Sequence, residues 1–91
     1  MKISILLPFK ENFSANYAGA VSLFVNDTIN QSTFKNTIKV FGNTDYKNYL
    51  SKKYTNIKFK KKIFSSTNRL YVEKFLNIEK RVNSDLIEIH N

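Results

Sequence analysis

Apolar residues gather near the start of the chain and then recur in short runs separated by polar segments. The first run, residues 2–9 (KISILLPF), is nearly continuous, which is typical of a strand buried on both faces of a parallel sheet. Residues 38–41 predict a second strand that ends at Gly42, and residues 85–91 predict a last one. Residues 57–60 alternate with period two, which predicts an edge strand whose lysines face solvent.

Between these strands the apolar residues adopt helical spacing. A stripe at i, i+3, i+4 and i+8 predicts a helix from about residue 20 to residue 31. A second stripe predicts the longest helix around residues 71–82, with its charged residues, Glu79 among them, largely on the other faces. The two stripes are Val21, Phe24, Val25 and Ile29, and Tyr71, Phe75, Ile78 and Val82.

Two segments carry signals for the start of a helix. Asn43 or Thr44 can cap a short helix over residues 46–54, where Tyr46, Tyr49, Leu50 and Tyr54 repeat the helical spacing. The longest helix has several candidate N-caps, namely Ser65, Ser66, Thr67 and Asn68.

The alternation of strands and helices defines the fold class. It is the pattern of an α/β domain with an open, mainly parallel sheet of about four strands and helices on its faces. Ligands bind such folds at the carboxyl ends of the strands. The loop after Phe9, the tip at Gly42 and Asn43, and the pair His90 and Asn91 are therefore expected along one edge of the sheet.

Composition narrows the possible chemistry. The 91 residues are 42% hydrophobic and include 2 Gly and 1 Pro, which indicates one modest globular domain. Without Cys and with one His, the chain cannot offer a thiol nucleophile, a Cys-based zinc site or a multi-histidine metal site, so we expect no metal or cofactor. The first apolar run is too short for a signal sequence or a membrane span. We therefore expect a cytoplasmic protein.

The formal net charge of +8 predicts attraction to anionic partners, whether nucleic acid, acidic lipid or phosphorylated ligand. The alternative is that the charge has no functional cause, because an AT-rich coding sequence would also produce a chain rich in Lys and Asn. Lysines at positions 52, 53, 58 and 60–62 alternate with aromatic residues, as in a nucleic-acid-binding stripe. The period of two, however, places Ile57 and Phe59 opposite Lys58 and Lys60. Ile57 and the Phe59 ring are therefore expected in the core, and a nucleic-acid partner is disfavoured.

Two places can carry ligand chemistry. In Tyr17-Ala18-Gly19-Ala20, a glycine at the start of a helix can let backbone N–H groups approach a phosphate, or can simply permit a tight turn. His90 follows a strand, so its imidazole is expected at the carboxyl edge, where it can donate to a hydroxyl or assist proton transfer; the alternative is a solvent-exposed histidine. Asn91 can hydrogen-bond a sugar hydroxyl. No G-x-G-x-x-G fingerprint or P-loop is present, which disfavours an oxidoreductase or an NTPase.

Four segments together resemble the N-terminal Rossmann-like domain of GT-B glycosyltransferases of family 4. They are KISILLPF, AGAVSLFV, IKVFGN and SDLIEIHN, and they span essentially residues 1–91. The resemblance implies a partial, acceptor-side domain, with the donor-binding domain outside these residues. It also implies that Gly19 matches the second glycine of the family's Gly-Gly pair near the donor phosphates and acceptor, that Ala18 replaces the first, and that His90 lies close to the donor sugar.

The function implied by this resemblance is transfer of a sugar from a nucleotide-sugar donor to a glycan or lipid-linked acceptor, without a metal. Residues 1–91 alone are expected to show no transferase turnover. A peripheral position at the inner membrane face, held by anionic lipids, is expected to appear as flotation with acidic but not with neutral liposomes. The alternative is a small basic stand-alone α/β module that binds nucleic acid or a phosphorylated ligand.

Overall fold

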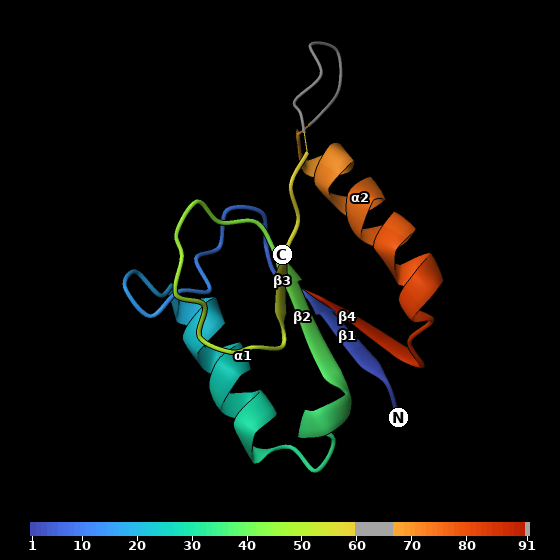
Figure 1. Cartoon of the computed structure of the whole chain (residues 1–91), viewed down its shortest axis with the longest axis horizontal. Coiled ribbons are helices and arrows are strands. Elements are labelled where there is room, and N and C mark those ends of the chain that lie inside the picture. The colour runs from blue at the N-terminus through green and yellow to red at the C-terminus, as the bar shows by residue number, and fades with distance from the viewer. Residues whose placement is uncertain (60–66, 91) are drawn as a thin grey trace.

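A computed structural model describes residues 1–59 and 67–90. Within these residues the chain forms four strands and two α-helices, with one short 3-10 helix before the second strand. The elements are β1 (Ile3–Leu6), α1 (Ala20–Gln31), η1 (Lys35–Thr37), β2 (Ile38–Gly42), β3 (Tyr54–Asn56), α2 (Thr67–Val82) and β4 (Leu86–Ile89). The strands form one parallel sheet in the order β3-β2-β1-β4. The helices flank the sheet on opposite sides, as Figure 1 shows. The predicted open α/β fold is confirmed.

Strand β1 separates the two halves of the core, because its residues alternate between the two faces of the sheet. Ile5 and the following Leu7 belong to the cluster under α1, and Leu6 belongs to the cluster under α2. Ile3 pairs with Ile38 of β2 on one side and with Leu86 of β4 on the other. The continuous apolar run therefore reflects burial on both faces, as predicted.

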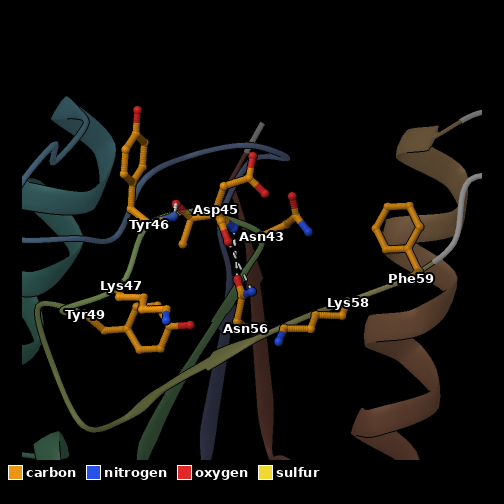
Figure 2. Close-up of a pocket in the computed structure, with 9 residues that line it drawn as sticks. Asn43, Asp45, Tyr46, Lys47, Tyr49, Asn56, Lys58 and Phe59 are labelled. Atoms are coloured by element: carbon orange, nitrogen blue, oxygen red, sulfur yellow. Dashed lines mark hydrogen bonds between the residues drawn. The ribbon is translucent and has the colours of Figure 1, made fainter.

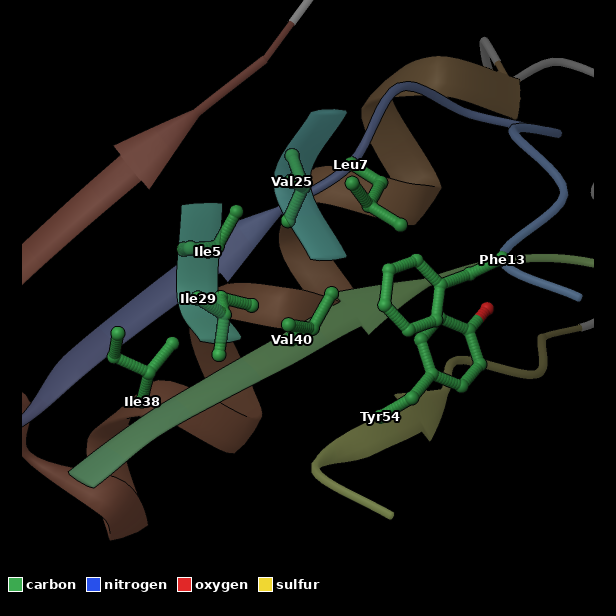
Figure 3. Close-up of a cluster of buried hydrophobic side chains, with 8 residues drawn as sticks. All are labelled: Ile5, Leu7, Phe13, Val25, Ile29, Ile38, Val40 and Tyr54. Atoms are coloured by element: carbon green, nitrogen blue, oxygen red, sulfur yellow. The ribbon is translucent and has the colours of Figure 1, made fainter. Parts of the chain in front are cut away.

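The α1 side of the core joins two helical residues to the sheet and to the connection between β1 and α1 (Figure 3). Val25 and Ile29 of α1 pack with Val40 of β2, and the rings of Phe13 and Tyr54 stack with their centroids 5.2 Å apart. The helix boundaries match the prediction, but its inward face is different. Ser22, Val25 and Ile29 are buried, whereas Phe24 is 65% exposed.

The α2 side of the core is held by a ring contact and a buried hydrogen bond. Phe75 meets Phe41 of β2 edge-on, with ring centroids 5.3 Å apart. The hydroxyl of Tyr71 donates to the carbonyl oxygen of Leu7 at 2.6 Å, and both residues are buried. Helix α2 is thus anchored to the segment that continues from β1.

Glu79 corrects the prediction for the polar face of this helix. It lies on the buried stripe of α2, one turn after Phe75. Its carboxylate accepts hydrogen bonds from the Ser4 hydroxyl at 2.8 Å and from the Ser84 backbone N–H at 2.7 Å. A buried carboxylate needs such donors, so Glu79 ties α2 to β1 and to the turn before β4.

Residues 43–53 do not form the predicted short helix. They form a loop that crosses the α1 side of the molecule (Figure 1) and is fixed by an antiparallel bridge between Ser14 and Tyr49. Asn48 has a φ of 59°, which is incompatible with an α-helix. Tyr46 packs against Tyr17 outside the segment, so the tyrosines serve separate contacts instead of one helical face.

The third strand lies earlier than predicted, at β3, and residues 57–59 lie beyond its end, where the N–H of Ile57 still donates to the carbonyl of Gly42 at 2.7 Å. The alternation itself is correct in burial: Ile57 is buried, Lys58 is exposed and Phe59 is half-buried. All three residues of β3 pair with β2, and β3 is an edge strand, as expected. Position 60, and the candidate N-caps at 65 and 66, lie outside the described residues.

The other edge strand, β4, is bare on both faces. All four of its residues are exposed, with Leu86 at 50% and Ile89 at 52%. Helix α2 covers β1, β2 and the segment after β3 but leaves β4 uncovered. Apolar residues on an exposed edge strand are normally covered by another part of the protein or by a partner, because they otherwise promote aggregation.

We predict that Tyr71→Phe lowers stability by about 1–2 kcal/mol, because the buried carbonyl of Leu7 loses its donor. Thermal denaturation should show a Tm lower by about 5–10 °C. Tyr46→Phe, which changes an exposed tyrosine, is the matched control and should leave Tm within about 1 °C. An equal Tm for both variants would contradict the assigned role of Tyr71.

Stability should also fall at alkaline pH, because Tyr71 and Tyr54 are buried with their hydroxyls protonated. Burial raises the pKa of Tyr71 well above its ordinary value of 10.0, and burial followed by the nearby Tyr71 and Tyr49 hydroxyls does the same for Tyr54. The folded state then keeps protons that the unfolded state releases above pH 10, so unfolding becomes easier as pH rises past that value. Urea denaturation at pH 8 to 11 should show that the free energy of unfolding declines with pH, and that it declines less steeply in Tyr71→Phe than in the parent. The same pH dependence in both proteins would contradict the role given to Tyr71.

Candidate functional site

Three hollows follow the edge of the sheet where the parallel strands end. Their volumes are about 280, 430 and 380 Å³, running from the end of β4 to the end of β3. Phe9 lines the first two, and Asn43, Asp45 and Phe59 line the second and third. Because neighbouring hollows share walls, we treat them as one feature, the carboxyl-edge crevice.

The first hollow lies between the ends of β1 and β4 and contains His90. The His90 backbone N–H donates to the carbonyl of Leu6 at 2.9 Å, which extends the β1–β4 ladder and fixes the backbone. Its ring Nε2 is 3.0 Å from a carboxylate oxygen of Glu88, and the side chain is 22% exposed. The predicted position of His90 at this edge is confirmed.

This end of the crevice is the topological switch point of the sheet. From β1 the chain passes through α1 to β2 on one side, and from β3 it passes through α2 on the opposite face to β4 on the other side (Figure 1). The connections after β1 and β3 therefore lead to opposite faces of the sheet. In this fold class ligands bind at such a switch point, outside the carboxyl ends of the strands.

The middle hollow is shaped by a tight turn after β1. The N–H of Glu11 donates to the carbonyl of Pro8 at 3.1 Å, and Lys10 adopts a φ of 66°, a left-handed conformation that is uncommon for residues other than glycine. The turn directs the Lys10 ammonium to within 3.6 Å of the Asp45 carboxylate. It also sets Phe9 against Phe59, with ring centroids 5.8 Å apart.

The third hollow has a floor of hydrogen-bonded polar residues (Figure 2). The side chain of Asn56 accepts from the Thr44 backbone N–H at 2.9 Å and donates to the Thr44 carbonyl at 3.2 Å. The Thr44 hydroxyl donates to the Asn12 side chain at 2.7 Å, and the Asn43 amide donates to the carbonyl of Ile57 at 2.8 Å. These bonds fix the ends of β2 and β3 relative to each other.

The walls of the third hollow carry rings and ammonium groups. Tyr49 and Lys47 come from the loop after β2, and Lys58 and Phe59 follow β3 (Figure 2). These residues are not among the predicted site residues, because the spacing of the tyrosines predicted a helix for Tyr49 and the alternation predicted a solvated strand face for Lys58. Their position directly after β2 and β3 is the signal that could have identified them.

Gly19 lies at the same edge of the sheet but outside the crevice. It is the N-cap of α1, and a Cβ at this position would collide with the Glu11 carboxylate. That carboxylate accepts from the Ser22 backbone N–H at 3.2 Å and from the Ser22 hydroxyl at 2.7 Å. Glu11 thus occupies the positive end of the helix, where a phosphate was expected to approach.

The remaining predicted site residues are placed as follows. Ala18 is half-buried beside Gly19, and neither residue lines a hollow of the crevice. Asn91 lies outside the described residues. Gly19 and His90 therefore share the carboxyl edge, as expected, but His90 alone of the two faces the crevice, and the phosphate role of Ala18 and Gly19 stays a prediction.

The lysine-rich stretch does not present a row of stacking rings in its described part. Tyr54 is buried and stacked on Phe13, and Phe59 packs against Phe9 and Tyr71. Phe59 thus packs on the α2 side of the core, as the period of two predicted, whereas Tyr54, for which the spacing of the tyrosines predicted a helix, belongs to the α1 side of the core. Positions 60–62 and 64 lie outside the described residues.

Comparison with protein-family models, with curated proteins and with solved structures finds no significant match. Among residues 1–59 and 67–90, no helix is long and apolar enough to cross a lipid bilayer. The same part of the chain holds no cluster of three or more His, Asp or Glu side chains arranged to bind a metal ion.

We predict that Gly19→Ala and Glu11→Ala each destabilise the protein by about 1 kcal/mol, because each removes the same helix cap. The φ of −76° at Gly19 suits alanine, so the cost of Gly19→Ala comes from displacing Glu11. In the Glu11→Ala background, Gly19→Ala should therefore cost nothing further. Urea denaturation of the two single variants and the double variant measures this coupling. Additive costs would refute a shared cap.

Proposed function

We propose that this chain supplies the acceptor-side wall of a glycosyltransferase cleft, in which a sugar passes from a nucleotide-sugar donor to a glycan or lipid-linked acceptor. The main support is the carboxyl-edge crevice at the switch point of a parallel sheet. Ligands of open α/β folds bind in such a crevice. The resemblance to the N-terminal domain of family 4 glycosyltransferases gives that ligand its chemical class.

The lining of the crevice is suited to a saccharide. Sugars combine apolar C–H faces, which pack on aromatic rings, with hydroxyls, which need polar partners. Phe9, Tyr46 and Tyr49 line the crevice together with amides and charged groups such as Asn43 and Asp45. An aromatic and polar mixture of this kind provides both types of contact.

In this proposal His90 faces the transferred sugar at the β1–β4 end of the crevice. Its backbone is held by the hydrogen bond to Leu6, and its ring is restrained by Glu88 at 3.0 Å. A restrained imidazole can hydrogen-bond a sugar hydroxyl without first losing much side-chain freedom. Glu88 acts here as a positioning residue.

The bare strand β4 supports the presence of further α/β structure beside this wall. Leu86 and Ile89 are about half exposed, and both faces of the strand are open. Pairing with the β4 edge of a second copy would supply hydrogen-bond partners to the free backbone groups of β4, but it would leave both faces of β4 exposed to solvent. A neighbouring strand with its own helices would cover the edge and the faces together.

Amide chemical-shift mapping of the labelled chain tests the proposal. Titration with UDP-glucose and with neutral and acidic oligosaccharides should shift the amides of Phe9, Asn43 and His90 at the carboxyl edge. Ile38 and Leu86, at the amino edge, should not move. His90→Ala should lower the affinity for UDP-glucose, as measured by the titration, by about tenfold, because one good polar contact is lost. Asn36→Ala, which changes an exposed residue at the amino edge, should not weaken it.

Shifts confined to the amino edge, or no response to any sugar or nucleotide-sugar, would contradict the proposal. Binding of single-stranded oligonucleotides in preference to every saccharide would favour the stand-alone binding module instead.

A further inference from the structure

We infer that the saccharide held at the β2–β3 end of the crevice is anionic, carrying a carboxylate or a phosphate that Lys47 and Lys58 bind while Tyr49 packs against a sugar ring. This inference rests on the proposed function and deepens it by naming the substrate class. We call the site the Tyr49 subsite and define it by Tyr49, Lys47, Lys58 and Asn56, which line the hollow of about 380 Å³.

The floor of the Tyr49 subsite is ordered before any ligand arrives. Asn56 makes two hydrogen bonds to the backbone of Thr44 and accepts a third from the Tyr54 hydroxyl at 2.9 Å. Thr44 is itself buried and bonded to Asn12. A ligand therefore meets a fixed surface and loses little binding energy in ordering it.

The Tyr49 ring is a supported platform. Its backbone is held by the bridge to Ser14, and the next residue, Leu50, donates its N–H to the carbonyl of Phe13 at 3.2 Å. The ring packs against that of Tyr54, with centroids 4.5 Å apart, yet Tyr49 stays 41% exposed. One part of the ring is thus held by the core while another part is free to pack on a sugar.

The charges around this platform are unbalanced. Lys47 and Lys58 approach from two different segments, and in Figure 2 the Lys58 side chain extends toward Asn56. Asp45 is the one carboxylate lining this hollow among the described residues, and it already pairs with Lys10 at 3.6 Å. A neutral sugar would leave the two ammonium groups without an anion, whereas a carboxylate or phosphate would accept charge-assisted hydrogen bonds from both.

The dimensions favour a short saccharide segment over a nucleic acid. A hollow of about 380 Å³ has the size of a small-molecule site. Single-stranded nucleic acid instead needs a longer groove with successive stacking rings. Of the rings near Tyr49, Tyr54 is buried on Phe13, Phe59 is half-buried against Phe9 and Tyr71, and Tyr46 packs against Tyr17.

The test measures binding to the full chain by titration at low salt. The probes are a tetrasaccharide of alternating glucuronic acid and N-acetylglucosamine, the neutral tetramer of N-acetylglucosamine, glucose 1-phosphate, inorganic phosphate and oligo-dT. The acidic tetrasaccharide should bind about tenfold more tightly than the neutral one, which corresponds to two partly exposed ion pairs. Comparing the uronate with glucose 1-phosphate shows which anion the site prefers.

A pair of charge-matched variants locates the effect. Lys47→Gln/Lys58→Gln should lose about tenfold in affinity for the acidic tetrasaccharide and change by less than about twofold for the neutral one. Lys35→Gln/Lys52→Gln removes the same net charge from exposed positions outside the hollow and should change both affinities by less than about twofold. All four lysines are exposed, so both variants should keep the Tm of the parent within about 2 °C.

Each contrary result has a distinct meaning. Equal affinity for the acidic and neutral tetrasaccharides would overturn the anionic assignment and leave the proposed function standing. Equal losses in the two lysine variants would overturn the Tyr49 subsite, because general charge would then explain the preference. Inorganic phosphate or oligo-dT binding as tightly as the saccharides would overturn the saccharide assignment. Failure of every sugar to bind would overturn both this inference and the proposed function.

Discussion

The whole arrangement depends on the burial of β1 on both faces between two parallel neighbours. Its backbone pairs with β2 and β4, while Ile5 and Leu6 point into opposite halves of the core. In so small a domain each helix has this one sheet to pack against, so the central strand joins two cores that would each be marginal alone. The buried bonds from Tyr71 to Leu7 and from Glu79 to Ser4 then fix α2 to this strand and its extension.

The same constraint positions the crevice. Since all strands are parallel, every segment that leaves a carboxyl end begins at the same edge, and the order β3-β2-β1-β4 places the ends of β1 and β4 side by side at the switch point. The turn at Lys10, the polar floor around Asn56 and the backbone of His90 are thus parts of one surface, although they lie far apart in the sequence. The other potential anion site, the start of α1, is filled by the chain's own Glu11.

Periodicity predicted the elements that are long or buried on both sides. It identified β1, α1, β2 and α2 closely, because their apolar residues face the core at regular intervals. It failed over residues 43–59, where the tyrosines have helical spacing but pack against different partners: Tyr46 against Tyr17 and Tyr49 against Tyr54. Hydropathy also predicted the wrong exposure for Glu79 and Phe24. The Glu79 carboxylate is buried because two donors satisfy it, and Phe24 is exposed although it is aromatic.

The site was predictable in its location but not in its members. The α/β order placed His90 and the loop after Phe9 at the carboxyl edge, and the structure places them there. That Lys47, Tyr49 and Lys58 share a hollow depends on the path of the loop after β2 and on the early end of β3. Those features arise from the Asn56–Thr44 bonds and the Ser14–Tyr49 bridge, which link residues too distant in sequence for a local pattern to show.

The most direct test of the central claim, that the carboxyl-edge crevice is a saccharide site, is the measurement of intermolecular NOEs between a bound oligosaccharide and assigned side chains. We predict NOEs from sugar protons to the rings of Tyr49 and Phe9. NOEs confined to the opposite edge of the sheet, where Thr37 and Val82 line a separate hollow, would contradict it.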